Sequence, residues 1–297
     1  MYRILNKNNK MSIIYSQVFK IIDKKIVSHS PKSLTYNLIK KTLNFIIELK
    51  KKNSKKINTY YINDILKNIR FKRYDFVAFK SEDLMNLEEL IMMKYYFNNR
   101  KYYKTFLDLG ANVGLHSVIA SKLGFKVDSY EPDKSHFQGL KENCKINNLK
   151  NIKINNKAVF NKTGKVTFVQ VKNNTTANHI VGLKKNLYGP IYKQDVKSVA
   201  ANALFKKNDL VKMDIEGAEY SVLKSIDHDY WLNTDCFVSI HNNIVAKKIF
   251  NYFKKTKINL FSSKVNWKKV KKFYEMPTCH AEGLLFISTK KSMNWSN

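Results

Sequence analysis

Residues 107–114 read LDLGANVG, a short apolar run that enters a turn with two glycines. Gly110 can take the backbone angles of a tight turn, and Gly114 lets a ligand or a neighbouring segment approach the next helix closely. Asn112, midway between them, tolerates a left-handed conformation better than most residues. The stretch predicts a strand, a turn and the start of a helix, and a glycine-rich turn alone does not identify a ligand.

From residue 104 onward, short apolar runs alternate with helical patterns. We expect strands in TFLDLG, FKVDSYEP, NIKINNKAVF, GKVTFVQV, CFVSIHNN and EGLLFIS. We expect helices in LHSVIASKLG and KSHFQGLKENCKINN, and a strand, turn and helix in DLVKMDIEGAEYSVLKSI. This alternation predicts an α/β fold with a mostly parallel sheet and helices on both faces.

The segment 1–80 differs from the rest because it is Lys-rich and shows helical spacing without recognisable chemistry. Ser30 and Pro31 predict the start of one helix, and a second is expected after Asn63. We therefore divide the chain into a helical N-terminal extension of unknown role, 1–80, and a main domain, 81–297. Asn86 is the expected N-cap of a helix that opens the main domain.

The charge of the chain invites a nucleic-acid hypothesis, but its composition weakens that hypothesis. The 297 residues carry a formal net charge of +31, yet only four of the 54 basic residues are Arg. Arg is the residue that nucleic-acid readers use for bidentate phosphate and guanine contacts. The excess of Lys is spread along the chain, so a solvated basic surface is favoured, and nucleic acid stays an alternative partner.

Three widely separated cysteines, Cys144, Cys236 and Cys279, form no C-x-x-C pair, so they indicate neither a zinc site nor a disulfide framework. Charged residues interrupt the apolar runs near the start, and no run has the length of a membrane span. We expect a cytoplasmic protein, whose basic surface could still contact anionic lipid. The oligomeric state is not indicated.

The acidic residue Glu131 narrows the choice of ligand. It ends the strand after the glycine turn, 23 residues beyond Asp108, where a carboxylate can accept hydrogen bonds from two ribose hydroxyls. A dinucleotide site would use G-x-G-x-x-G to admit a pyrophosphate, and Asn112 and Leu115 stand at the second and third of those positions. Asp108 inside the turn would repel phosphate but suit a cation. S-adenosylmethionine, which carries a ribose, an ammonium and a sulfonium, fits these features.

Four stretches share the pattern of a known family, namely FLDLGANVGLHSVIA, VDSYEPD, LKENCKINN and LVKMDIEGAEYSVLKSI. Through them the sequence, over roughly residues 86–288, resembles the FkbM-type S-adenosylmethionine-dependent methyltransferases. This resemblance implies the Rossmann-like, seven-stranded sheet of class I methyltransferases and acceptors such as hydroxyl groups of sugars or natural products. By the same resemblance, the cofactor would contact the turn, the ribose carboxylate and an adenine segment, which are Asp108, Gly110, Asn112, Gly114, Glu131, Asn156 and Ala158.

Methyl transfer to a hydroxyl needs alignment and a base, which we expect at the carboxyl ends of the central strands. Asp214 and Glu216 follow one strand and His241 follows another, and we take these three as candidate catalytic residues, with Asp214 first. Asp214 could instead cap the following helix, and His241 could be only a hydrogen-bonded strand-end residue. Glu219 is as well explained by the helix dipole. Nothing in the spacing demands a metal, so none is assigned.

The leading hypothesis is an O-methyltransferase acting on a sugar, a glycan or glycolipid precursor, or a natural product. One alternative is a nucleic-acid methyltransferase, although the chain has no N/D-P-P-Y type block that would stack a flipped base. Another is a non-catalytic basic binding protein on the same fold.

Overall fold

A computed structural model describes residues 13–22, 30–53, 55–76, 79–171, 178–181 and 190–295. Its central sheet has eight strands in the order β15-β14-β16-β13-β12-β5-β6-β7. Their bounds are β5 Thr105–Leu109, β6 Lys126–Tyr130, β7 Ile152–Asn155, β12 Leu210–Met213, β13 Asp235–Ser239, β14 Asn259–Ser262, β15 Lys268–Lys269 and β16 Leu284–Ser288. The strands from β13 to β7 are parallel, and β16 runs antiparallel to both neighbours.

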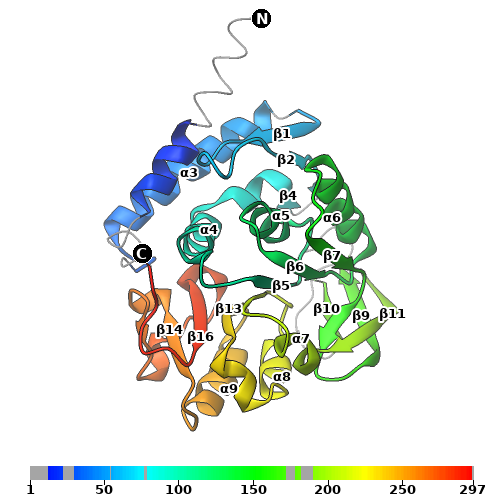
Figure 1. The fold of residues 1–297 in the computed structure, drawn as a ribbon, viewed down its shortest axis with the longest axis vertical. Coiled ribbons are helices and arrows are strands. Elements are labelled where there is room, and N and C mark those ends of the chain that lie inside the picture. The colour runs from blue at the N-terminus through cyan, green and yellow to red at the C-terminus, as the bar shows by residue number, and fades with distance from the viewer. Residues whose placement is uncertain are drawn as a thin grey trace, which may run out of the picture.

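Helices cover both faces of this sheet, with α4 and α5 on one side and α8 and α9 on the other (Figure 1). The helices of the main domain are α4 Leu87–Asn99, α5 Leu115–Lys122, α6 Lys134–Ile146, α7 Ala201–Phe205, α8 Glu219–Lys224 and α9 Asn243–Phe253. Strands buried on both faces favour apolar residues, and β5, β12 and β13 are mostly apolar, with Asp108 and Lys212 as a buried pair of opposite charge. The expected α/β class is confirmed. The described sheet has eight strands instead of seven because the two-residue β15 extends its edge.

The strand order reverses between β5 and β12. From β5 the chain proceeds to β6 and β7 on one side and later returns to pair β12 with the other side of β5. In this register Asp108 lies beside Lys212. In open α/β sheets, ligands bind beyond the carboxyl ends of the strands at such a reversal, so the topology marks the edge that Gly110 and Asp214 occupy.

A smaller sheet lies beside β6 and β7 (Figure 1). It has the order β10-β9-β11-β8, with β8 parallel to β11 and the other pairs antiparallel. The strands are β8 Ala158–Phe160, β9 Gly164–Val171, β10 His179–Ile180 and β11 Ile191–Ala200. The single strand expected over 151–160 is divided into β7 and β8, which belong to different sheets, and the strand expected at β9 is confirmed. Strand β11 was not predicted, because its sequence alternates polar and apolar residues only weakly.

The N-terminal part contains the long helix α3, Leu34–Lys52, and two short hairpins. The hairpins are formed by β1 Ile57–Tyr60 with β2 Ile69–Lys72, and by β3 Asp75–Phe76 with β4 Phe79–Lys80, and the 3₁₀-helix η1, Ser81–Met85, follows. A further helix occupies 13–21. The helix expected after Ser30 and Pro31 is confirmed, although its N-cap is Ser33, whose hydroxyl accepts from the Tyr36 amide.

The helix expected after Asn63 is wrong. The Asn63 side-chain oxygen accepts hydrogen bonds from the amides of Ile65 and Leu66, which closes a local turn in place of a helix. Leu66 and Ile69 are fully buried, and Ile69 begins β2. By contrast, the expected cap at Asn86 is confirmed, since its side chain accepts from the Glu89 amide at the start of α4.

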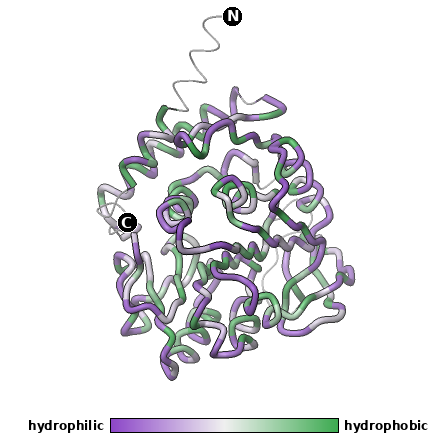
Figure 2. Tube along the Cα trace, viewed as in Figure 1, coloured by the Kyte–Doolittle hydropathy of each residue, from purple (hydrophilic) through white to green (hydrophobic). Residues whose placement is uncertain are grey.

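Helix α3 packs on the main domain through one side. Leu43, Ile46 and Tyr36 belong to the same buried cluster as Phe106 of β5 and Val118 of α5. Figure 2 shows hydrophobic and hydrophilic residues alternating along α3, as an amphipathic helix requires. In the described part of the chain, no helix has the length and apolarity needed to cross a membrane.

Candidate functional site

A cavity of about 560 Å³ opens at the carboxyl ends of β5, β6, β12 and β13. Its walls combine the glycine turn, the residues that follow β6 and β12, strands β8, β9 and β10 of the small sheet and the first turn of α5. Its lining includes Gly110, Ala111, Asn112, His116, Glu131, Asp133, His136, Ala158, Val159, Phe168, Asn178, Ile180, Lys212, Asp214, Glu216 and His241.

The glycine turn fits tightly against the loop after β12. Gly110 has a φ of +76°, and a Cβ placed on it would stand 1.8 Å from the carbonyl oxygen of Asp214. Gly114 has a φ of +92°, and a Cβ there would stand 2.5 Å from a methyl carbon of Leu140 in α6. Asn112 has a φ of +52°, as its expected left-handed tolerance allows. The turn therefore requires both glycines, although Gly114 itself does not line the cavity.

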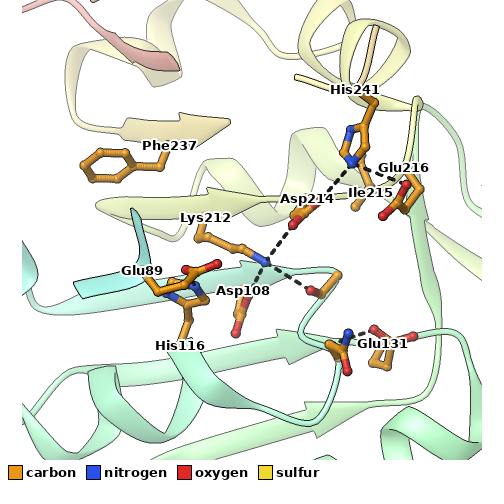
Figure 3. Close-up of polar contacts among 12 residues, drawn as sticks. Glu89, Asp108, His116, Glu131, Lys212, Asp214, Ile215, Glu216, Phe237 and His241 are labelled. Atoms are coloured by element: carbon orange, nitrogen blue, oxygen red, sulfur yellow. Dashed lines mark hydrogen bonds and ion pairs between the residues drawn. The ribbon is translucent and has the colours of Figure 1, made fainter. Parts of the chain in front are cut away.

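Asp108 lies beneath the turn and does not line the cavity. Its Oδ2 accepts from the Ser117 hydroxyl at 2.6 Å, and its Oδ1 is 3.9 Å from Nζ of Lys212. Lys212 also donates to the Gly110 carbonyl at 3.2 Å and stands 3.7 Å from Oδ2 of Asp214 (Figure 3). The negative charge expected to face a cationic ligand at Asp108 is thus directed to a buried lysine, which ties β5 to β12.

The Lys212 side chain stays charged in this setting. Burial lowers its pKa, but the nearby Asp214 and Asp108 outweigh burial, so the pKa is raised overall. A buried ammonium among carboxylates fixes the relative positions of the two strand ends. Separating the strand ends would leave a buried charge without its nearby partner of opposite sign. No local sequence pattern predicts this contact, since it depends on which strand pairs with β5.

Glu131 lines the cavity with a carboxylate that also shapes the turn. Its Oε2 accepts from the Asn112 amide and its Oε1 from the Asp133 amide, both at 2.8 Å. Burial raises its pKa to about 8, against the lowering effect of these two backbone donors. Each carboxylate oxygen has two acceptor positions, so the group can accept further hydrogen bonds from a ligand.

The predicted adenine segment divides into two parts. Ala158 lines the cavity, together with the apolar side chains of Val159, Phe168 and Ile180. Asn156 instead donates to the backbone carbonyls of Glu131 and Pro132 at 2.9 and 3.1 Å, so it supports the loop after β6. The apolar wall from the small sheet was missed by sequence reasoning because it depends on how that sheet docks.

His241, after β13, meets three carboxylates. Its Nε2 lies 3.1 Å from Oδ1 of Asp214 and 3.3 Å from Oε2 of Glu216 (Figure 3). Its Nδ1 lies 2.9 Å from Oε1 of Glu219. Burial lowers the pKa of His241, but Glu219 and then Asp214 and Glu216 raise it well above its ordinary value. The structure therefore brings the three candidate catalytic residues together, with an imidazole that holds its proton instead of one poised as a base near neutrality.

Glu219 is fully buried and does more than complement the helix dipole. Its Oε1 accepts from the amides of Ile215 and Gly217 at 3.2 and 3.1 Å. These bonds hold the sharp turn in which Glu216 has a φ of +54°, a conformation that non-glycine residues seldom adopt. The Asp-x-Glu-Gly-x-Glu segment is thus a rigid turn that directs Glu216 toward His241.

A second cavity, of about 510 Å³, shares Glu89 and Asp214 with the first. Its walls come from α3, η1, the start of α4 and the region before β16, namely Lys40, Asn44, Ile47, Glu48, Asp83, Asn86, Glu88, Glu89, Asp214, Ser239, Ala281 and Leu284. Its titratable lining is mostly acidic, although the chain as a whole is strongly basic. At the junction, Oε2 of Glu89 contacts Nε2 of His116 at 2.6 Å, and His116 also contacts the Tyr96 hydroxyl.

Comparison with known proteins gives one family match. The model of the methyltransferase FkbM domain family matches residues 108–263. No curated protein matches the chain. The match includes the glycine turn, Glu131 and all three candidate catalytic residues, whereas α3 and most of the second cavity lie outside it.

Several solved structures are similar to the chain at low sequence identity. The ribosomal protein L11 methylase of Lactobacillus delbrueckii subsp. bulgaricus is 12% identical, over 66% of this chain and 74% of that chain, with a TM-score of 0.35. The precorrin-6y C5,15-methyltransferase of Geobacter metallireducens GS-15 is 10% identical, over 67% of this chain and 85% of that chain, with a TM-score of 0.38. The tRNA (uracil-54, C5)-methyltransferase of Pyrococcus abyssi, solved with S-adenosyl-L-homocysteine, is 10% identical, over 78% of this chain and 44% of that chain, with a TM-score of 0.42.

Proposed function

The chain belongs to the FkbM methyltransferase family, whose model matches more than half of it, and from this premise we propose that it methylates a hydroxyl group of an uncharged, sugar-like acceptor. It is a methyltransferase, and its cofactor is S-adenosylmethionine. The acceptor class and the transfer to oxygen are the proposal. The observation that carries the proposal is the acid- and amide-lined second cavity that meets the first at Asp214.

The residues of the first cavity fit the cofactor. Glu131 would accept hydrogen bonds from the ribose hydroxyls, and Val159, Phe168 and Ile180 offer an apolar wall for the adenine. Gly110 lines the same cavity and would border the amino-acid part of the cofactor. Because Gly110 has no Cβ, the turn can lie against the loop after β12. Asp108, Gly114 and Asn156 would act from behind this surface, by holding the turn and the loop that follows β6.

The second cavity suits an acceptor with many hydroxyl groups and no phosphate. Asn44, Asn86 and Ser239 can both donate and accept hydrogen bonds, and the carboxylates of Glu48 and Glu88 accept them. The five lining carboxylates are paired with Lys40, Lys51, His116 and Lys212, so these cations are already engaged and favour a neutral acceptor over a polyanion. The proposal keeps the division of the chain into an N-terminal extension, 1–80, and a main domain, 81–297. The extension would supply one wall of the acceptor site through α3.

Catalysis then requires alignment and removal of one proton. When bound, S-adenosylmethionine supplies an electrophilic methyl group, which the acceptor oxygen takes as the carbon–sulfur bond breaks and its electron pair stays on sulfur. Asp214 borders both cavities and would take the hydroxyl proton. Lys212 and His241 flank its two oxygens at 3.7 and 3.1 Å, so they fix the carboxylate in place.

The net charge of +31 is the observation that favours a nucleic-acid acceptor as the second candidate. The second cavity argues against it, because its lining lysine, Lys40, is already paired with Glu88, and Lys51 is paired with Glu48 and Asp83. A non-catalytic binding protein has less support, because the glycine turn, Glu131 and Asp214 all line one cavity.

Transfer of a labelled methyl group from S-adenosylmethionine onto a panel of neutral oligosaccharides, sugar phosphates and RNA tests the proposal. We expect label on a neutral sugar, with loss of turnover but not of cofactor binding in Asp214→Asn. The matched control is Asp195→Asn, an exposed carboxylate on β11 away from both cavities, which should keep full turnover. Label on RNA alone would overturn the proposed acceptor. Full turnover in Asp214→Asn would overturn the assignment of Asp214 as the catalytic base.

A further inference from the structure

Asp214, Glu216 and His241 each offer one ligand atom, and these atoms all lie within 4.8 Å of one another. They come from the ends of two adjacent parallel strands, β12 and β13, and from the rigid turn between β12 and α8. We propose that these three side chains form a binding site for a divalent metal ion. The inference goes beyond the proposed function, which assigns no metal.

The spacing of the ligand atoms matches a shared cation. Nε2 of His241 is 3.1 Å from one carboxylate oxygen and 3.3 Å from another. Ligand atoms bound at 2.0–2.2 Å lie roughly 3.0 Å apart at a right angle and roughly 3.4 Å apart at a tetrahedral angle. A single N–H on Nε2 can point well at only one of two acceptors, whereas a metal ion at this corner would contact both carboxylates and the imidazole.

Glu219 prepares the imidazole for this role. Its fully buried carboxylate lies 2.9 Å from Nδ1 of His241 and is itself fixed by the amides of Ile215 and Gly217. A carboxylate on one ring nitrogen fixes the tautomer and turns the other nitrogen toward the metal, an arrangement typical of metal-binding histidines. Glu219 is therefore a positioning residue in this site.

Charge and access also suit a dication. The carboxylates of Asp214 and Glu216 line this corner of the cavity, and the buried carboxylate of Glu219 lies against His241. Nζ of Lys212 is 3.7 Å from Oδ2 of Asp214, so Oδ1 remains directed to His241. The Asp214 and Glu216 side chains are 29% and 23% exposed, so an ion can enter from the cavity that they line. Three protein ligands would leave coordination positions open toward that cavity.

The donor set selects the kind of ion. Carboxylates suit Mg²⁺ and Mn²⁺, and imidazole suits transition metals, so two carboxylates and one imidazole favour a divalent transition ion such as Mn²⁺. Such an ion would bind the acceptor oxygen and ease the loss of its proton. Asp214 would bind through Oδ1, which faces His241, and Oδ2 stays directed toward Lys212, so the base role of the proposed function is kept on that atom.

Binding of Mn²⁺ alone to the full chain tests the site, followed by electron paramagnetic resonance with pulsed detection of ¹⁴N coupling. We expect one bound ion per chain and a coupling from a directly bound imidazole nitrogen. In His241→Gln the coupling should vanish, and in Asp214→Asn the affinity should fall at least about tenfold. Glu219→Gln should lower the affinity roughly 10- to 100-fold while the ¹⁴N coupling remains. Asp195→Asn is the control and should bind Mn²⁺ as the parent does.

Thermal melting of each variant identifies those that fail to fold, and the coupling in the parent chain needs no variant. Absence of tight Mn²⁺ binding, a bound ion without ¹⁴N coupling, or unchanged binding in His241→Gln would overturn the proposal. Calorimetry with S-adenosylmethionine in metal-free buffer separates this result from the proposed function. If the cofactor binds and Mn²⁺ does not, only the metal site is excluded.

Discussion

The ionisation of Glu131 predicts how the affinity for a nucleoside depends on pH, and this prediction does not involve the acceptor site. Its pKa is raised to about 8, first by burial and further by the charge of Asp133, while the Asn112 and Asp133 amides and Lys212 act in the opposite direction. A ribose hydroxyl donates best to the ionised carboxylate, so binding below this pKa must first release a proton. Nucleoside affinity should therefore rise with pH up to about 8 and then level off.

The magnitude follows from the fraction of ionised Glu131. At pH 7 about one tenth of the molecules carry the ionised group and at pH 9 about nine tenths, so the Kd should be roughly tenfold weaker at pH 7, a difference of about 1.4 kcal/mol. The ligand for this measurement is 5′-methylthioadenosine, which has the adenine and ribose but no amino-acid group or sulfonium. His136, the neighbouring imidazole in the cavity, does not interfere, because burial lowers its pKa and leaves it neutral across this range.

Isothermal titration calorimetry in two buffers with different heats of ionisation measures both the affinity and the proton release. At pH 7 we expect about 0.9 proton to be released per nucleoside bound. Glu131→Gln should bind more weakly and without pH dependence, whereas Asp195→Asn should behave as the parent does. Equal Kd values at pH 7 and pH 9 in the parent chain, with no proton release, would refute the assignment of Glu131.

Three further predictions concern stability, measured as the free energy of unfolding in urea. Gly110→Ala should cost about 1–3 kcal/mol more than Gly124→Ala, because both have a positive φ but only Gly110 would place its Cβ against a backbone carbonyl; equal losses would contradict the packing described. Leu43→Ala on α3 should cost about 2–5 kcal/mol, and the exposed Phe45→Ala about 0.5 kcal/mol or less, if α3 folds with the main domain. Lys212→Met should cost about 3–5 kcal/mol, since it removes the cation beside the buried Asp108 and one of the two cations beside Asp214, and a neutral effect would show that the buried ammonium is not needed.

Local chemistry made much of the main domain predictable. Residues close together in the sequence determine most of its strands and helices, namely the apolar run of β5, the glycines after it and the alternation that follows. The family and fold class followed from these elements. The side chains at the ends of β6, β12 and β13 could be placed near one another because parallel strands bring their carboxyl ends to one edge. Glu131, Asp214 and His241 do line a common cavity.

Features that depend on long-range pairing were beyond the sequence. Asp108 was expected to face the ligand, but β12 places Lys212 beside it in the register of the sheet. His241 was expected near neutrality, but its proton is held by carboxylates from a turn more than twenty residues earlier. The second cavity joins α3 to the region before β16, two segments at opposite ends of the chain, and no local pattern announces such a contact. Asn63 shows the converse case, where two hydrogen bonds to one side-chain oxygen override an apolar helical spacing.

A crystal structure of the chain with S-adenosylhomocysteine tests the central claim most directly. We predict that the nucleoside occupies the cavity at the ends of β5 and β6, with both ribose hydroxyls within hydrogen-bond distance of the Glu131 carboxylate and the adenine against Phe168 and Ile180. The sulfur should face Asp214. A nucleoside bound away from Glu131, or one whose sulfur points away from the second cavity, would contradict the account.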